Sequence, residues 1–286
     1  MITLCNERLE IQIQEPGSQY KRSRFDWSGI CQQITLNGSY TFLSQEADES
    51  NRGSEGVGLS DEFGINTPVG YDEAEIGDWF PKIGVGFLQK VSTDPYDFFF
   101  DYPIQPANIR VESSGDQMVA FQQVSKILNG WGWNLQKTYS LAGSTLTISY
   151  LLENTGQKTI QTETYNHNFL AMGGKTVGPD YQLQLPFDLQ LEQLLGPIAT
   201  HGNTLTLTET PPKYIYALQE NCNPKQNLEW QLMHRTTGQG VRVQEEFPLF
   251  KFAIWGMRHV ISPEFFLWIR LAPGEKRSWN RQYTFF

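Results

Sequence analysis

Hydrophobic and polar residues alternate over several stretches of the chain. Residues 9–14 and 204–208 each place a hydrophobic side chain at every second position, which predicts β-strands with one buried face. Residues 134–141 and 145–152 are rich in β-forming residues, and the short segment 142–144, with a central glycine, lies between them. Two such runs joined in this way predict a β-hairpin.

The last part of the chain adds two strand-like runs, residues 265–271 and 279–286, with a Pro-Gly turn between them. Helical patterns are scarce, and only residues 72–79 and 189–195 could each form one or two turns. The sequence therefore predicts an all-β protein, a large antiparallel β-sandwich with few short helices. Because no internal repeat or linker is visible, we expect a single domain over residues 1–286.

Composition supports a folded protein and argues against two classes of partner. Of the 286 residues, 39% are hydrophobic and 19% are charged, so the chain can fill a substantial core. The 31 acidic residues outnumber the 22 basic ones, which gives a net charge of −9. A broad cationic surface for nucleic acid or for an anionic membrane is therefore not expected.

The cysteines and the start of the chain bear on location. The first residues lack a basic segment followed by a long apolar one, and no apolar stretch approaches the roughly 20 residues of a membrane-spanning helix. Cys5, Cys31 and Cys222 are widely separated, which suits a reducing compartment better than a disulfide framework. These features predict a cytoplasmic protein.

Several kinds of chemistry lack their sequence motifs. There is no HExxH motif, no Walker loop, no dinucleotide-type GxGxxG and no GxSxG elbow. The acidic segment 45–58 lacks the ligand spacing of a calcium loop, so we expect a solvated loop there. The sequence thus predicts no metal and no cofactor, and general acid and base groups remain as the candidate chemistry.

One of the four histidines has unusual neighbours. His201 falls in a turn, His234 at a strand edge and His259 on an aromatic-rich strand, and all three are expected to be structural or surface residues. His167, in contrast, stands between two asparagines in Tyr-Asn-His-Asn-Phe. In a strand His167 faces away from Asn166 and its second Asn neighbour. The pattern by itself allows either a buried structural histidine or a functional one.

At this point the sequence resembles the aldose 1-epimerase (galactose mutarotase-like) superfamily. The Asn166-His167 motif, preceded by Leu-Leu-Glu-Asn-Thr-Gly at residues 151–156, is similar to the strand that carries the catalytic histidine in that superfamily. Residues 24–29 resemble its opening strand, and residues 271–283 resemble its closing hairpin. The resemblance implies a large β-sandwich that binds a sugar on a concave sheet face.

The activity implied by the resemblance is interconversion of sugar anomers. A base takes the proton of the anomeric hydroxyl while an acid protonates the ring oxygen, and no cofactor is needed. Each group contributes about 10²–10⁴-fold. The resemblance makes His167 the acid, since histidine titrates near neutrality, and makes its neighbour Asn166 a sugar contact.

The base is less clear from the sequence. The superfamily keeps a glutamate on a strand before the closing hairpin, where residues 252–256 of this chain contain no acid. The nearest candidate is Glu264, which follows Ser-Pro and precedes two phenylalanines that could raise its pKa by desolvation. A solvated turn position is the alternative for Glu264. Glu275, in the Pro-Gly-Glu turn, is expected to be exposed.

Two basic residues are candidate sugar contacts. Lys82 lies where the superfamily has a second histidine, and it could donate to a sugar hydroxyl or to an anionic group, or be a surface lysine. Arg24 could contact the sugar, or pair with Asp26 or with an acid of a loop.

Three functions stay open from the sequence. The first is an aldose 1-epimerase-like isomerase acting on a small sugar through His167 and a carboxylate. The second is a carbohydrate-binding relative without activity, which the missing glutamate at residues 252–256 favours. The third is an epimerase of a phosphorylated hexose, which needs Lys82, Arg24 or Arg258 to converge at the sugar.

Overall fold

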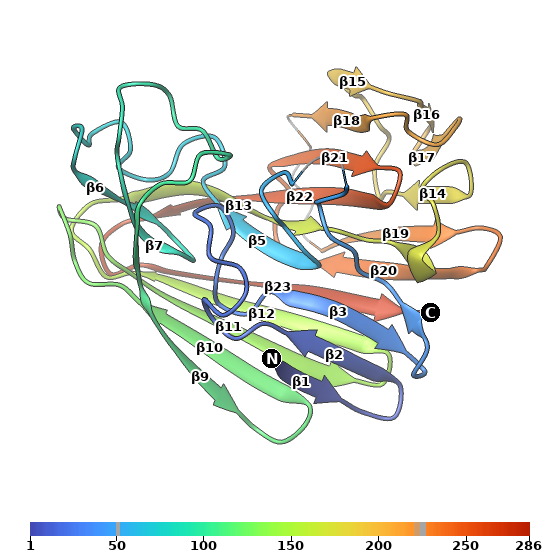
Figure 1. Ribbon diagram of the computed structural model, residues 1–286, viewed down its shortest axis with the longest axis horizontal. Coiled ribbons are helices and arrows are strands. Elements are labelled where there is room, and N and C mark those ends of the chain that lie inside the picture. The colour runs from blue at the N-terminus through green and yellow to red at the C-terminus, as the bar shows by residue number, and fades with distance from the viewer. Residues whose placement is uncertain (50–51, 221, 223–226) are drawn as a thin grey trace.

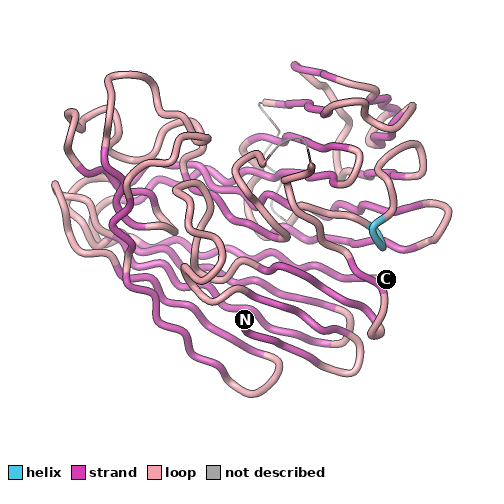
Figure 2. The backbone as a smooth tube through the Cα atoms, in the orientation of Figure 1, coloured by secondary structure: helices cyan, strands magenta, loops and turns pink. Residues whose placement is uncertain are grey.

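Strands and loops make up almost all of the computed structural model, which describes residues 1–49, 52–220, 222 and 227–286 (Figures 1 and 2). Within these residues, two ten-stranded antiparallel sheets face each other. The first sheet has the order β1 (Ile2–Cys5), β2 (Leu9–Ile13), β3 (Cys31–Leu36), β5 (Leu59–Phe63), β13 (Ile160–Asn168), β22 (Val260–Leu271), β21 (Lys251–Met257), β18 (Tyr214–Gln219) and β15 (Gln193–Leu195), with β4 (Tyr40–Thr41) paired to β3.

The second sheet forms the other layer of the sandwich. Its order is β16 (Ile198–His201), β17 (Thr204–Leu207), β14 (Tyr181–Gln184), β19 (Leu228–His234), β20 (Gln239–Glu245), β23 (Lys276–Phe285), β12 (Thr145–Asn154), β11 (Trp133–Ala142), β10 (Met118–Val124) and β9 (Asn108–Ser113). A small sheet of β6 (Trp79–Lys82), β7 (Gly86–Gln89) and β8 (Ile104–Pro106) lies at one end, opposite β14 to β18 (Figure 1).

The predicted fold class and most predicted strands are confirmed. β11 and β12 form the expected hairpin, paired from Ala142 with Thr145 to Trp133 with Asn154. Buried and half-buried residues alternate along the whole of β12, and its buried side chains face the first sheet. The hydrophobic core therefore fills the space between the two sheets, with the stacked rings of Tyr150 and Trp279 as one of its contacts.

The predicted closing hairpin is wrong in its pairing. β22 and β23 are both strands, as expected, but β22 pairs with β13 and β21 in the first sheet, while β23 pairs with β12 and β20 in the second. The Pro-Gly turn at Pro273 therefore crosses between layers. Local sequence identifies a strand and a turn, but the partner of a strand depends on which face it buries.

Two helical expectations and one strand expectation are also wrong. Residues 72–79 form turns that lead into β6, and residues 189–195 end in β15. Residues 24–29 are irregular, because the backbone N–H groups of Asp26 and Trp27 bond to two different segments, at Asp61 and Gly84, and so form no ladder.

A 3₁₀ turn at Met172–Gly174 is the helical element of the described residues, and none of their helices is long and apolar enough to span a membrane. The single domain over residues 1–286 stays a prediction.

Candidate active site

Strand β13 presents its aromatic residues and its asparagines on opposite faces. Tyr165 and His167 project from the face of the first sheet that points away from the second sheet, and Phe169 continues this row. Asn166 and Asn168 point into the sandwich, where they bond to Asp61 and Tyr283. This division follows from the two-residue period of a strand and confirms the predicted placement of His167.

His167 meets Glu264 on this face. The Nε2 atom of His167 lies 3.3 Å from Oε1 of Glu264, and the two side chains are only 5% and 7% exposed. Glu264 stands within β22, next to β13, and Ser262 Oγ also donates to its Oε1 at 3.2 Å. Glu264 is therefore neither at a turn nor solvated, and it reaches His167 because β22 and β13 are neighbours.

Aromatic rings hold the imidazole in place. The ring of Phe169 stacks on His167 with centroids 3.9 Å apart and 8° between the planes. Phe25 and Trp255 approach His167 edge-on, at 5.9 and 5.3 Å. A Cβ added at Gly56 would lie 2.4 Å from the Phe169 ring, so the loop over this stack requires a glycine there. The imidazole is thus confined in an apolar setting.

Burial moves the pKa values of the pair in opposite directions. Desolvation raises the pKa of Glu264 to about 8, against the opposing charge of Arg24. Desolvation, and then the Arg24 charge, hold the pKa of His167 well below its usual value. At neutral pH the pair is therefore a protonated carboxyl beside a neutral imidazole, because a low-dielectric site disfavours both charged forms. Transfer of that one proton across the 3.3 Å contact converts it to an imidazolium and a carboxylate.

The raised pKa of Glu264 predicts a pH-dependent stability. The folded state keeps this proton up to about pH 8, whereas an unfolded chain loses it near 4.5. The folded state thus binds more protons between these values, and its stability falls as the pH rises through them. Glu264→Gln should make that fall smaller, as measured by urea unfolding across the window. An identical pH slope in the variant and in the wild type would contradict the raised pKa.

Arg24, whose charge acts on both groups of the pair, is held in place by neighbouring polar side chains. Its Nε donates to Glu62 Oε2 at 2.9 Å, and its Nη2 lies 3.0 Å from the Tyr165 hydroxyl, which itself donates to Glu62. Glu46, in the loop of residues 45–58, also lies within 3.9 Å of the guanidinium. Arg24 therefore pairs with a strand acid and a loop acid, and not with Asp26. The buried Glu46 is an exception to the predicted solvated loop, of which residues 50 and 51 lie outside the described residues.

Lys82 and Asn166 are fully buried, and they lie on opposite faces of the first sheet. Lys82 Nζ donates to Glu62 Oε1 at 3.0 Å, so it is not a surface lysine. Asn166 Nδ2 donates to Asp61 Oδ1 at 3.0 Å inside the sandwich. The structure thus brings His167, Glu264 and Arg24 together, and places Lys82 and Asn166 where they support neighbouring acids.

Known structures share this architecture at low sequence identity. A galactose mutarotase-like protein from Lactobacillus casei is 16% identical, with 100% of both chains covered and a TM-score of 0.64. A proposed aldose 1-epimerase from Escherichia coli is 14% identical, with 100% of this chain and 98% of that chain covered and a TM-score of 0.64. The chain has the galactose mutarotase-like fold. No family model and no curated protein matches it.

Within this galactose mutarotase-like fold, the other histidines lie away from the pair. His201 ends β16 rather than lying in a turn, and His234 ends β19. His259 lies in the turn between β21 and β22, not on a strand, and its Nε2 is 3.0 Å from the carbonyl of Gln45.

Glu62, which links Arg24, Lys82 and Tyr165, was not among the site residues predicted from the sequence. The signal was present: two adjacent acids interrupt the Leu59–Phe63 strand, and all five of its residues are buried. Adjacent residues of a strand face opposite sides, so one of the two acids had to lie on the face of His167. Buried acids need partners, and the nearby basic residues supply them.

Proposed function

We propose that this protein interconverts the anomers of a sugar at the His167–Glu264 pair. The observation that carries the proposal is that two buried titratable groups, on neighbouring strands, lie 3.3 Å apart with pKa values moved in opposite directions. Such pairs are suited to general acid and base catalysis. The structural neighbours described as galactose mutarotase-like and as a proposed aldose 1-epimerase agree with this assignment.

When the pair starts in its neutral form, the two groups supply both proton transfers of ring opening, and no cofactor is needed. The imidazole of His167 takes the proton of the anomeric hydroxyl, and the C1–O1 bond becomes a carbonyl as the bond from C1 to the ring oxygen breaks. The carboxyl of Glu264 gives its proton to the ring oxygen. After C1 rotates, the same transfers run in reverse and close the ring on the other face.

Each group therefore acts as acid in one half of the cycle and as base in the other. The sequence predicted His167 as the acid and Glu264 as the base. That arrangement arises when the proton of Glu264 has moved to His167. In either form the Arg24 charge stabilises the carboxylate as it forms, since it opposes the rise in the Glu264 pKa.

The charges around the pair favour a neutral sugar over a phosphorylated one. Glu62 binds both Arg24 and Lys82, and Glu46 adds a further negative charge near Arg24. Arg258 lines a different cavity, together with His259. The three basic residues that were candidates for binding a phosphate are therefore paired with acids or lie at a different cavity. The proposed substrate is a neutral aldose. The proposed location of the enzyme is the cytoplasm.

Exchange spectroscopy by NMR on a panel of free and phosphorylated aldoses tests the proposal. We expect the wild type to speed the exchange between α and β anomers of at least one neutral aldose well above the buffer rate. Glu264→Gln should slow this exchange at least about 100-fold, the scale for loss of a general acid. Binding of a sugar with no acceleration for any member of the panel would instead identify a carbohydrate-binding protein without activity.

A further inference from the structure

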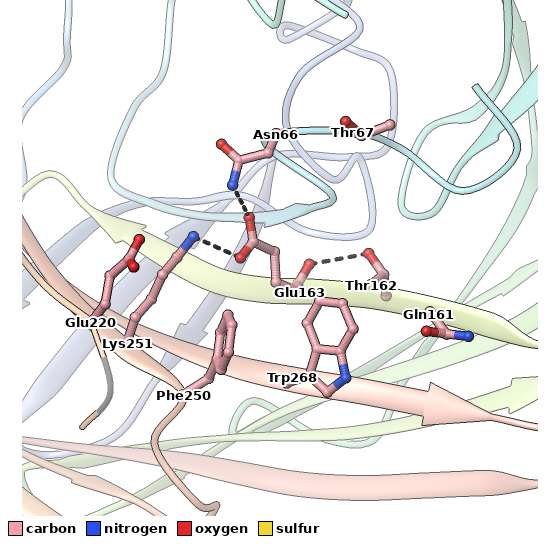
Figure 3. Close-up of a pocket in the computed structure, with 9 residues that line it drawn as sticks. All are labelled: Asn66, Thr67, Gln161, Thr162, Glu163, Glu220, Phe250, Lys251 and Trp268. Atoms are coloured by element: carbon pink, nitrogen blue, oxygen red, sulfur yellow. Dashed lines mark hydrogen bonds and ion pairs between the residues drawn. The ribbon is translucent and has the colours of Figure 1, made fainter. Parts of the chain in front are cut away.

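A cavity of about 350 Å³ (Figure 3) is lined by residues of β13 and β22. These two strands also carry His167 and Glu264. Glu163 of β13 and Trp268 of β22 are paired in register and line it. Glu163 shares its face with His167, because the two are an even number of residues apart in one strand. The cavity and the pair therefore lie on the same face of the first sheet.

Exposed aromatic rings form one side of the cavity. Trp268 is 45% exposed and Phe250 is 42% exposed, and their centroids lie 5.4 Å apart. All eight tryptophans lie within the described residues, and Trp268 is the exposed one among them. Exposed apolar surface that is rimmed by polar residues is typical of ligand-binding grooves. The C–H faces of a pyranose are suited to such rings.

Polar groups with fixed positions form the other side. The carboxylate of Glu163 accepts from Asn66 Nδ2 at 2.8 Å and pairs with Lys251 Nζ at 2.6 Å (Figure 3). The ion pair is nearly buried, with side chains 8% and 12% exposed. Because the two charges offset each other and Glu220 adds a negative one at the rim, the cavity is unsuited to an anion. Aligned donors and acceptors without net positive charge suit the hydroxyl groups of a neutral sugar.

We propose that this cavity binds one pyranose unit of a neutral oligosaccharide whose reducing end reaches His167 and Glu264. A strand advances about 3.3 Å per residue, so Glu163 and His167 lie about 13 Å apart along β13, farther than one ring extends. Between them lie the stacked rings of Tyr165 and Phe266. Half-buried Ile65, Tyr216 and Leu218 pack against these rings, and the oligosaccharide crosses this apolar strip. The inference names the substrate class and rests on the proposed function.

Titration calorimetry with neutral di- to tetrasaccharides, and with glucose and galactose for comparison, tests the inference. We expect the wild type to bind at least one oligosaccharide more tightly than either monosaccharide. Binding should also change the tryptophan fluorescence, through Trp268. Trp268→Ala should weaken oligosaccharide binding at least about tenfold, as expected for loss of a stacking ring, and Trp268→Phe should retain most of it. Val111→Ala, an exposed apolar residue of β9 in the other sheet, is the matched control and should bind as the wild type does.

The outcomes separate this inference from the proposed function. Equal binding of monosaccharides and oligosaccharides, no binding of any sugar in the panel, or wild-type affinity in Trp268→Ala overturns the oligosaccharide site. Anomer exchange on monosaccharides together with any of these results leaves the proposed function standing. Trp268-dependent oligosaccharide binding without anomer exchange supports the cavity and overturns catalysis at His167.

Discussion

Replacement of His167 by alanine is expected to lower kcat/KM for anomer exchange by at least about 100-fold, with the fold retained. The imidazole lies 3.3 Å from Glu264 and is the neutral partner of that carboxyl at neutral pH. Its removal takes away the base that accepts the anomeric proton in the proposed reaction. The rate is measured by NMR exchange on the aldose that the wild type converts fastest, and circular dichroism checks the fold.

The matched control for this variant is His234→Ala. His234 is also a buried histidine next to an aromatic ring, Tyr181, but it lies on β19 in the second sheet. Its removal also empties a buried position, and it should leave exchange close to the wild-type rate. If His167→Ala converts anomers as fast as His234→Ala does, His167 has no part in the chemistry.

Glu62→Gln is expected to lower the free energy of unfolding by about 3–5 kcal/mol, the scale for removing one partner of a buried ion pair. The Glu62 carboxylate is fully buried and binds Arg24 at 2.9 Å and Lys82 at 3.0 Å. Burial by itself would raise the pKa of Glu62, but the charges of Lys82 and Arg24 outweigh it and hold this pKa below its usual value. When this carboxylate is removed, the buried cations Arg24 and Lys82 each lose an ion-pair partner. Urea unfolding measures the loss.

Two further variants show whether this loss comes from the buried charges. Glu229→Gln removes an acid whose pair with Arg242 is half exposed, and it should change stability by less than about 1 kcal/mol. In Glu62→Gln with Lys82→Met, one of the two cations that lost Glu62 as a partner is gone, so part of the lost stability should return. A Glu62→Gln protein as stable as Glu229→Gln would show that the buried network contributes little.

Local sequence patterns predicted the strands better than their partners. The hairpin of β11 and β12 is correct because a short turn joins two strands that pair with each other. The same kind of pattern at Pro273 joins two strands that lie in different sheets. A tight turn limits where the next strand begins, but the choice of sheet depends on which hydrophobic face the strand buries.

The sequence by itself determined that the protein is a β-sandwich, that His167 lies in a strand and that its neighbouring asparagines face the other way. These features follow from a two-residue backbone period, which is local. Only the tertiary structure decided that Glu264 is the partner of His167, because the contact requires β13 and β22, which are far apart in the sequence, to be neighbours. It also decided the burial that moves both pKa values, and it placed Arg24 on Glu62, since desolvation and charge pairing depend on everything that packs around a group and not on its neighbours in the chain.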